Sequence, residues 1–149
     1  MAISSDLIAH AASAIASVKG IEADADSIIE DAYLLSLAFT EPNDFLSAVA
    51  NTQRAIAQLV EGTVSPAQLK YEHAGWLAYH YQHKVGQGQR ADMRIIFCRT
   101  EAGIRLRAYG HRSLPKDFYE RIADTRGISP QYRDMDRKGT CGMTPQMRP

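Results

Sequence analysis

The chain has 149 residues, of which 45% are hydrophobic and 23% charged, and its 17 Lys and Arg balance 17 Asp and Glu. This composition fits one globular domain and excludes wholesale disorder and fibrous repeats. No apolar run approaches the roughly 20 residues that span a bilayer, and the first residues lack the basic start of a secretory signal. We therefore expect a cytoplasmic protein. Its two cysteines do not make a disulfide scaffold. Cys98 is expected in the core and Cys141 as a free thiol.

The net charge of zero conceals two segments of opposite charge. Residues 1–66 carry two basic and nine acidic residues, a balance of −7, and residues 67–149 carry 15 basic and eight acidic residues, a balance of +7. A split of this size indicates contact of the basic part with nucleic acid or an acidic membrane. The alternative is two oppositely charged faces that pair with each other, and charge alone does not separate the two.

The first 62 residues are predicted to form three helices in a small antiparallel bundle. Apolar residues at helical spacing place the first helix over residues 3–18, with Gly20 as its stop. The second begins near residue 24 or 26, where its early carboxylates complement the helix dipole. The third spans about residues 43–60 and closes at Gly62.

The remaining residues read mostly as strands. A short helix is expected over residues 67–73, followed by strands over residues 76–85, 93–99 and 104–111. A helix over residues 114–126 closes the domain, and residues 127–149 are predicted to be a flexible tail. The fold class is therefore α+β, with an acidic helical segment over residues 1–62, then a basic domain over residues 67–126 that holds a small, three-stranded antiparallel sheet.

The strand over residues 104–111 carries the strongest candidate for a functional surface. Its even positions are apolar, and period-two alternation puts the odd ones, Arg105, Arg107, Tyr109 and His111, on one face of the sheet. Further basic residues on neighbouring segments are Lys84, Arg94, Arg99 and Arg112. Guanidinium groups fork onto phosphates, and aromatic rings stack on unpaired bases. The pattern favours nucleic-acid contact, and the alternative is a solvated face whose Arg and Tyr serve solubility.

Metal and nucleotide motifs are weaker. His73, His80 and His83 would bring two imidazoles together only on a helix, whereas the predicted strand puts His80 and His83 on opposite faces. No metal site is therefore expected. Gly86-Gln-Gly-Gln lacks the third glycine and the following helix of a phosphate-binding loop, so a hairpin turn explains it better and no nucleotide cofactor is expected.

Residues 90–122 resemble the C-terminal half of the RelE/ParE toxin superfamily. Members show a strand of the form Tyr-Arg-Ile-hydrophobic-Tyr, a short turn, a strand ending in Gly-His-Arg, and a Tyr a few residues later. Arg94-Ile-Ile-Phe97 is similar to the first strand and Gly110-His-Arg112 to the end of the second. Tyr119 matches the final Tyr, after a longer spacing than usual, and Met93 replaces an aromatic residue. The resemblance does not extend to the N-terminal helices.

The resemblance implies a small antiparallel sheet packed on helices. In the RelE branch it also implies metal-independent cleavage of mRNA in the ribosomal A site, without a cofactor. By that analogy Arg94 and Arg112 hold the scissile phosphate, and His111 or Tyr119 transfers a proton. The residues expected to grip RNA are Arg105 and Arg107, with Lys84, Arg90, Arg99 and Tyr109 as further contacts. The implied partners are mRNA, the ribosome and an antitoxin protein.

Two alternatives stay open. The ParE branch poisons DNA gyrase, although His111 favours the ribonuclease because imidazole titrates near neutral pH. A non-catalytic binding or regulatory protein on the same scaffold is the other. The acidic segment over residues 1–62 either packs on the basic sheet face and restrains activity in cis, or docks a partner or forms a homodimer through its helices. A membrane partner is not expected, because anionic lipid would repel its acidic helix faces.

Overall fold

A computed structural model describes residues 2–68, 75–86 and 88–126 of the chain. The helices in this part are α1 (Ser5–Ala16), α2 (Ala25–Ala38), α3 (Pro42–Glu61) and α4 (Phe118–Arg126). The strands are β1 (Ile21–Ala23), β2 (Ala67–Gln68), β3 (Leu77–Tyr81), β4 (Met93–Arg99) and β5 (Ile104–His111). The fold is therefore α+β, as the sequence predicts.

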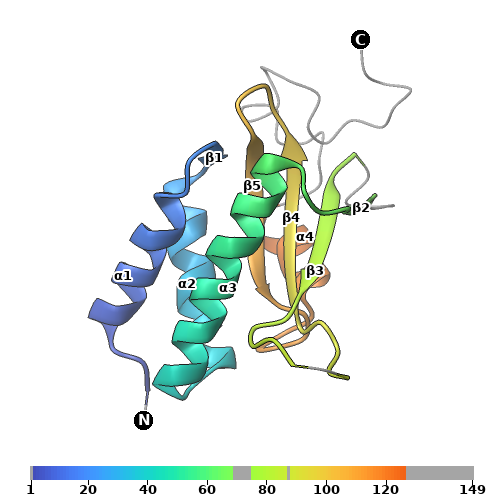
Figure 1. The fold of residues 1–149 in the computed structure, drawn as a ribbon. Helices are drawn as coiled ribbons and strands as arrows, with labels where there is room; N and C mark the ends of the chain where they lie inside the picture. The colour runs from blue at the N-terminus through green and yellow to red at the C-terminus, as the bar shows by residue number, and fades with distance from the viewer. Residues whose placement is uncertain (1, 69–74, 87, 127–149) are drawn as a thin grey trace.

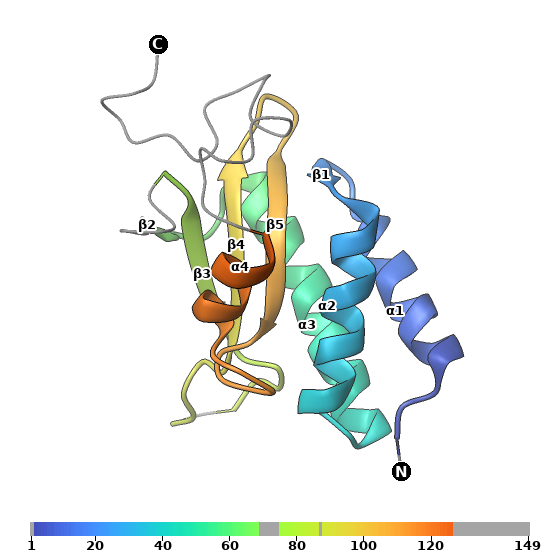
Figure 2. The same ribbon diagram turned by 180° about the vertical axis from the view of Figure 1, so that it is seen from behind.

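The elements form layers around one five-stranded sheet with the order β1-β5-β4-β3-β2. Helices α2 and α3 cover one face, with α1 packed on their outer side, and α4 lies on the opposite face (Figures 1 and 2). Strand β1 runs parallel to β5, and the other neighbours are antiparallel. We refer below to the helical face, covered by α1–α3, and to the α4 face.

The three N-terminal helices and the strands over residues 93–99 and 104–111 agree with the prediction. The three predicted strands form an antiparallel unit, β3-β4-β5, as expected. The prediction missed the two short outer strands, β1 and β2, which extend the sheet to five strands, and β1 makes the sheet mixed. Strand β1 has only three residues, too few for an alternating pattern to be recognised. Residues 67 and 68 form a strand instead of beginning a helix, and the rest of that expected helix lies outside the described residues. The closing helix begins at Phe118, four residues later than expected.

One main core joins the helices to the sheet. Fully buried side chains such as Phe45 and Ile56 of α3 pack in the same cluster as Ile95 and Phe97 of β4. Burial of one such side chain stabilises the fold by about 1.5–3 kcal/mol. The N-terminal helices are therefore not a separate bundle, because the sheet covers their apolar stripes. No helix of the described part is long and apolar enough to cross a membrane.

A smaller cluster lies between the sheet and α4. It contains the side chains of Trp76, Ile96, Cys98, Ala108, Phe118 and Ile122. Cys98 is buried there as predicted, but it is disulfide-bonded, which the sequence interpretation did not foresee. The predictions for Cys141 and for the tail over residues 127–149 fall outside the described residues.

A bulge in β5 changes which of its side chains face α4. Ile96 pairs with Ala108 and Phe97 with Leu106, so Arg107 has no counterpart on β4. The extra residue shifts the alternation by one position. Leu106 therefore faces the helices while Ala108, two residues on, belongs to the cluster under α4.

Candidate active site

The bulge and the packing together divide the predicted basic face of β5. Arg105 and Arg107 lie on the α4 face, whereas Tyr109 packs in the helical core and His111 stacks edge-on against Phe39 of the helical layer. Arg105, Arg107 and Tyr109 are 5%, 3% and 0% exposed. The prediction of a single exposed RNA-binding face on β5 is therefore wrong.

These three side chains hold the fold together. Arg105 donates to the Glu22 carboxylate at 3.0 Å, which ties β5 to β1. The Arg107 guanidinium lies 4.7 Å from the ring centroid of Trp76 and donates to the carbonyl of Arg126 at 2.9 Å. The Tyr109 hydroxyl donates to the carbonyl of Ile28 on α2 at 2.9 Å. Each contact is internal, so the β5 positions serve packing more than ligand binding.

A buried ion network accounts for more of the opposite charges. Asp31 of α2 is 1% exposed, and its carboxylate accepts from Arg121 at 2.8 Å and from Arg126 at 2.8 and 2.9 Å. Arg126 also donates to Glu30 at 2.9 Å. With the Arg105–Glu22 pair, three arginines of the basic segment bind three carboxylates of the acidic one. For these residues the alternative interpretation, in which the two segments pair with each other, is confirmed.

A different cluster forms on the α4 face, where β3 and β4 meet α4. His80 and Arg94 are direct partners in the register of the two strands, and both side chains point away from the helical core. The Tyr119 hydroxyl of α4 lies 3.4 Å from Nε2 of His80 and is also hydrogen-bonded to Arg94. Nη1 of Arg94 donates to the carbonyls of Ala91 and Met93 at 2.8 and 2.9 Å, which fixes the guanidinium.

Arg112, just beyond β5, completes this cluster. Its positive charge lies close enough to contribute to a lowered Arg94 pKa, after the larger effect of burial. Nε of Arg112 is buried without a hydrogen-bond partner in the described part of the chain. Guanidinium groups have the geometry to bind a phosphate group, and Arg94 lies beside one phenol and one imidazole, with Arg112 near it. Of the four predicted catalytic residues, Arg94 and Tyr119 are therefore brought into direct contact, and the charge of Arg112 lies near Arg94.

The electrostatics of this cluster suit proton transfer near neutral pH. Partial burial, and then the charge of Arg94, lower the pKa of His80, so its imidazole is neutral at pH 7. Burial raises the pKa of Tyr119, against the opposing effect of Arg94, so its phenol stays protonated. The site thus holds a neutral base beside a protonated acid.

His111, the fourth predicted catalytic residue, faces the other side of the sheet. Its Nδ1 accepts hydrogen bonds from the backbone N–H groups of Ser113 and Leu114, both at 3.1 Å. Burial is the main cause of its lowered pKa. His83 lies nearby, with Nδ1 at 2.6 Å from Asp92 and its ring against Phe39. His111 is therefore held by local contacts and is not part of the cluster around Tyr119.

The other predicted RNA contacts are dispersed. Lys84 and Arg90 are exposed in the segment between β3 and β4, at the end of the sheet that carries His80 and Arg94. Arg99 lies at the opposite end of β4 and donates to the carbonyl of Leu59 at 2.9 Å. Within the described ranges, no three His, Cys, Asp or Glu are grouped to hold a metal ion, and His73 lies outside them.

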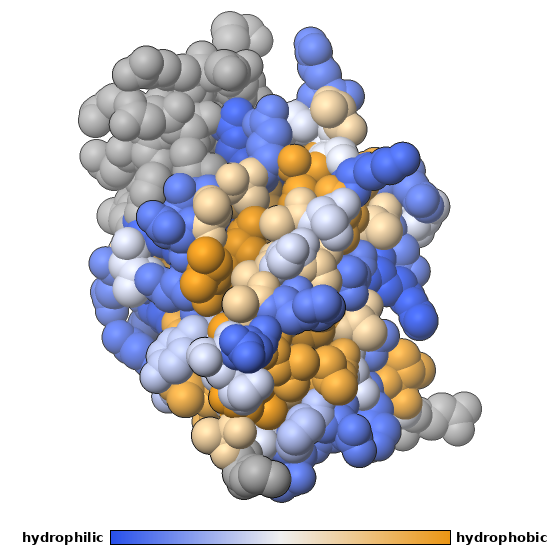
Figure 3. All heavy atoms as spheres, turned by 90° about the vertical axis from the view of Figure 1, so that its left-hand side faces the viewer, coloured by the Kyte–Doolittle hydropathy of each residue, from blue (hydrophilic) through white to orange (hydrophobic). Residues whose placement is uncertain are grey.

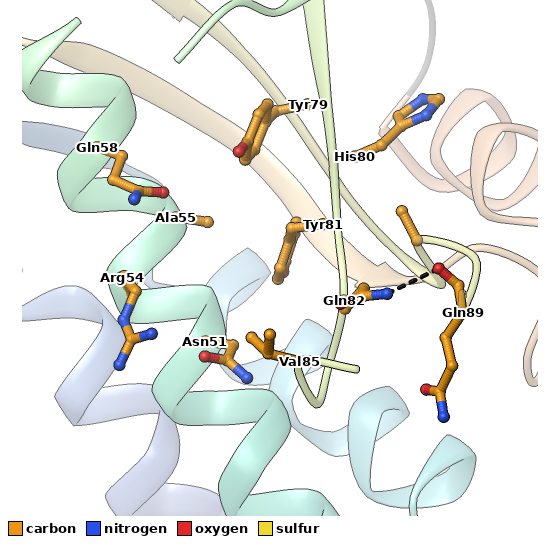
Figure 4. A pocket seen from close by; sticks show the side chains of 11 residues that line it. Asn51, Arg54, Ala55, Gln58, Tyr79, His80, Tyr81, Gln82, Val85 and Gln89 are labelled. Atoms are coloured by element: carbon orange, nitrogen blue, oxygen red, sulfur yellow. Dashed lines mark hydrogen bonds between the residues drawn. The ribbon is translucent and has the colours of Figure 1, made fainter. Parts of the chain in front are cut away.

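Two hollows lie on the helical side of the molecule. One, of about 390 Å³, lies between α3 and β3 and reaches His80 (Figure 4). The other is an apolar groove of about 560 Å³ between α1 and α2. Ile29 and Tyr33 line this groove, and with Leu37 they are about half exposed along α2. Figure 3, which views the molecule from the side of α1, shows apolar side chains gathered there.

His80 is the site residue that the sequence interpretation missed. The sequence pattern suggests His80 only as a possible metal ligand, although the strand alternation places it on the face opposite Tyr79 and Tyr81. Comparisons with family models, with curated proteins and with solved structures found no match to the chain.

Proposed function

We propose that the protein is a toxin-like ribonuclease that cleaves mRNA, with the ribosome presenting the substrate. The observation that carries this proposal is the convergence of His80, Arg94, Arg112 and Tyr119 on one face of the sheet. Together they supply a base, an acid and two phosphate-binding groups, which are the functions that cleavage next to a ribose 2′-hydroxyl needs. The resemblance of residues 90–122 to the RelE branch leads to the same reaction.

In the proposed reaction the ribose 2′-oxygen attacks the adjacent phosphorus while the bond to the 5′-oxygen breaks. Nε2 of His80 accepts the proton of the 2′-hydroxyl, and the Tyr119 hydroxyl donates its proton to the leaving 5′-oxygen. Arg94 and Arg112 stabilise the extra negative charge on the phosphorane. The products are a 2′,3′-cyclic phosphate and a free 5′-hydroxyl, so no water is consumed.

The 3.4 Å contact between Tyr119 and His80 gives this mechanism a direct way to reset. After cleavage His80 carries the proton and Tyr119 is a phenolate, the reverse of their stable forms. Transfer of that proton across the contact restores both groups. Arg94, hydrogen-bonded to Tyr119, stabilises the phenolate until this transfer occurs.

The test is cleavage of a defined mRNA by the purified full-length protein, with and without ribosomes, and mapping of the new ends. We expect cleavage with cyclic phosphate ends, lost in Arg94→Ala. An intact mRNA under both conditions would remove the ribonuclease proposal. In that case inhibition of gyrase supercoiling would assign the protein to the ParE-type alternative.

The second candidate is a non-catalytic binding protein on the same scaffold. The burial of Arg105, Arg107 and Tyr109 favours this candidate, because their burial removes much of the basic surface expected to grip RNA.

Under either function we propose an antitoxin-like protein partner and a cytoplasmic location. We also propose self-association through the N-terminal helices, for which the apolar groove between α1 and α2 offers a surface. In the described part of the chain α1–α3 lie on the face opposite Tyr119, so these helices do not cover the proposed site and would not restrain it in cis.

A further inference from the structure

The hollow between α3 and β3 borders the proposed active site. Tyr79 and Tyr81 project from β3 toward α3, where they face Ala55 and Gln58, while His80 projects the other way (Figure 4). Tyr79 and His80 are consecutive residues. A ligand that crosses the outer edge of β3 therefore passes from this hollow to the cluster around Tyr119.

In the part of the chain that the structure describes, the outer edge of β3 is only partly paired beside the hollow. Strand β2 pairs only with Leu77 and Ala78, so residues 79–81 have no strand partner on that side among the described residues. Within the described ranges, the backbone groups on this edge have no strand partner, and unpaired groups of this kind can hydrogen-bond a ligand.

The wall of the hollow offers a fixed aromatic surface. The rings of Tyr79 and Tyr81 are parallel to within 7°, with centroids 6.2 Å apart. The Tyr81 hydroxyl lies 2.7 Å from Thr52 Oγ1, and this buried contact holds its ring. Tyr79, which is half-buried, leans on this anchored neighbour and lines the open space.

The polar groups around the hollow are of two kinds. Asn51 and Gln82 are engaged, since Asn51 donates to the carbonyl of His83 at 2.7 Å and Gln82 to that of Gln89 at 2.7 Å. By contrast, the side chains of Arg54 and Gln58 on α3 make no hydrogen bond or ion pair in the part of the chain that the structure describes. An amide that both donates and accepts thus lies beside an unpaired guanidinium and a tyrosine ring.

We propose that this hollow binds an unpaired RNA base next to the cleaved bond, an inference that rests on the proposed function. Single-stranded RNA is recognised by stacking of bases on aromatic rings and by hydrogen bonds to base edges. Tyr79 stacks on the base, Gln58 reads its edge, and Arg54 binds a backbone phosphate. An extended peptide would also fit an open strand edge. The base is favoured because an aromatic ring and a free amide face the space next to the phosphate-binding cluster.

The test measures RNA binding separately from cleavage. The full-length Tyr119→Phe protein serves as the background, and fluorescence anisotropy follows labelled oligo(A), oligo(C), oligo(G) and oligo(U). We expect one base to be preferred. Loss of the stacked ring in Tyr79→Leu should weaken its binding roughly 10-fold, the usual effect of removing one stacking aromatic. Gln58→Ala should level the affinities for the four oligonucleotides, and Arg54→Ala should weaken all four alike.

Tyr33→Leu is the matched control, because Tyr33 is an exposed tyrosine of α2 outside this hollow. Equal thermal unfolding midpoints show that each variant is folded. If Tyr79→Leu and Tyr33→Leu bind every oligonucleotide with the same affinity, the inference is overturned. This holds even if the wild-type protein, which keeps Tyr119, cleaves RNA. If poly-glutamate displaces RNA equally from both variants, the hollow recognises charge alone and the base-binding role is also overturned. Absence of cleavage together with base-selective binding would instead remove only the proposed reaction.

Discussion

Asp31 of α2 and Arg121 of α4 form an ion pair at 2.8 Å although their helices cover opposite faces of the sheet. The contact is made around the edge of β5 that β1 leaves uncovered, since β1 pairs only with residues 104–106. There the Asp31 carboxylate also accepts from the backbone N–H of Tyr109 at 3.1 Å. One buried carboxylate thus replaces the missing strand partner and connects both helical layers.

Replacing Asp31 with Asn should lower the free energy of unfolding by about 3–5 kcal/mol, the usual cost of removing one partner from a buried ion pair. Arg121 and Arg126 would keep their charges, with only Glu30 left to balance them. The measurement is urea unfolding at pH 7. Glu30→Gln is the control, and because its side chain is 47% exposed it should cost only about 0–1 kcal/mol. Equal losses in the two variants would contradict the central role of Asp31.

The close approach of the backbones at Gly20 and Gly103, where β1 and β5 begin, leads to a second prediction about stability. A Cβ atom at Gly103 would lie 2.1 Å from the carbonyl oxygen of Gly20, which accepts from the backbone N–H of Ile104 at 2.9 Å. Gly103→Ala therefore forces these backbones apart, and we expect a loss of about 1–3 kcal/mol or more. The measurement is the thermal unfolding midpoint of Gly103→Ala. The control is Ala102→Ser, a substitution at an exposed neighbouring position that should leave the midpoint unchanged. A midpoint equal to that of the control would show that the junction can adjust.

The helices and the two long strands could be predicted because each carries a clear hydrophobic pattern. This pattern has helical spacing in the helices, is a nearly continuous apolar run in one strand, and repeats at every second residue in the other. The faces of β5 could not, because the bulge depends on how β4 pairs with it. The burial of Arg105 and Arg107 could not be predicted either, because it depends on the tertiary partners Glu22 and Trp76, which the strand pattern does not reveal. The place of His80 in the cluster depends on its contact with Tyr119, which is 39 residues away in the sequence. Tyr119 lies on a helix whose packing position the sequence does not specify. Local pattern thus predicted the elements, and tertiary contacts determined the site.

Substitution of single histidines should distinguish the histidine predicted from the sequence, His111, from the proposed base, His80. His80→Gln should lower kcat roughly 10²–10⁴-fold, the usual contribution of a general acid or base. His111→Gln should lower it far less, because His111 lies on the helical face. The measurement is single-turnover cleavage of ribosome-bound mRNA, with circular dichroism to confirm folding. The reverse order of effects would restore His111 as the catalytic histidine.

The pH dependence of cleavage should reflect the same imidazole. In the proposed reaction His80 acts in its neutral form, so kcat/KM should fall as the pH drops through its pKa, which lies below the ordinary value of 6.5. Because Arg94 contributes to that lowering, Arg94→Met should raise the His80 pKa, as followed by NMR titration of the ring protons. Tyr33→Leu should leave it unchanged. A His80 pKa that is the same with and without Arg94 would contradict the electrostatic coupling.

His111 should make the fold less stable in acid. Its folded pKa lies below the ordinary value of 6.5, mainly through burial, with Asp92 opposing and Arg112 adding to the effect. A lowered folded pKa means that the unfolded chain binds the proton more readily. The stability it contributes is therefore present above about pH 6.5 and lost as the pH falls through the folded value. Protonation at Nδ1 would also break the hydrogen bonds from Ser113 and Leu114.

Urea unfolding at pH 7 and at pH 5 tests this prediction. The free energy of unfolding should fall less between these two pH values in His111→Asn than in the wild type. His10→Asn, an exposed position on α1, should behave as the wild type, and identical pH profiles for all three proteins would assign the acid sensitivity to other groups.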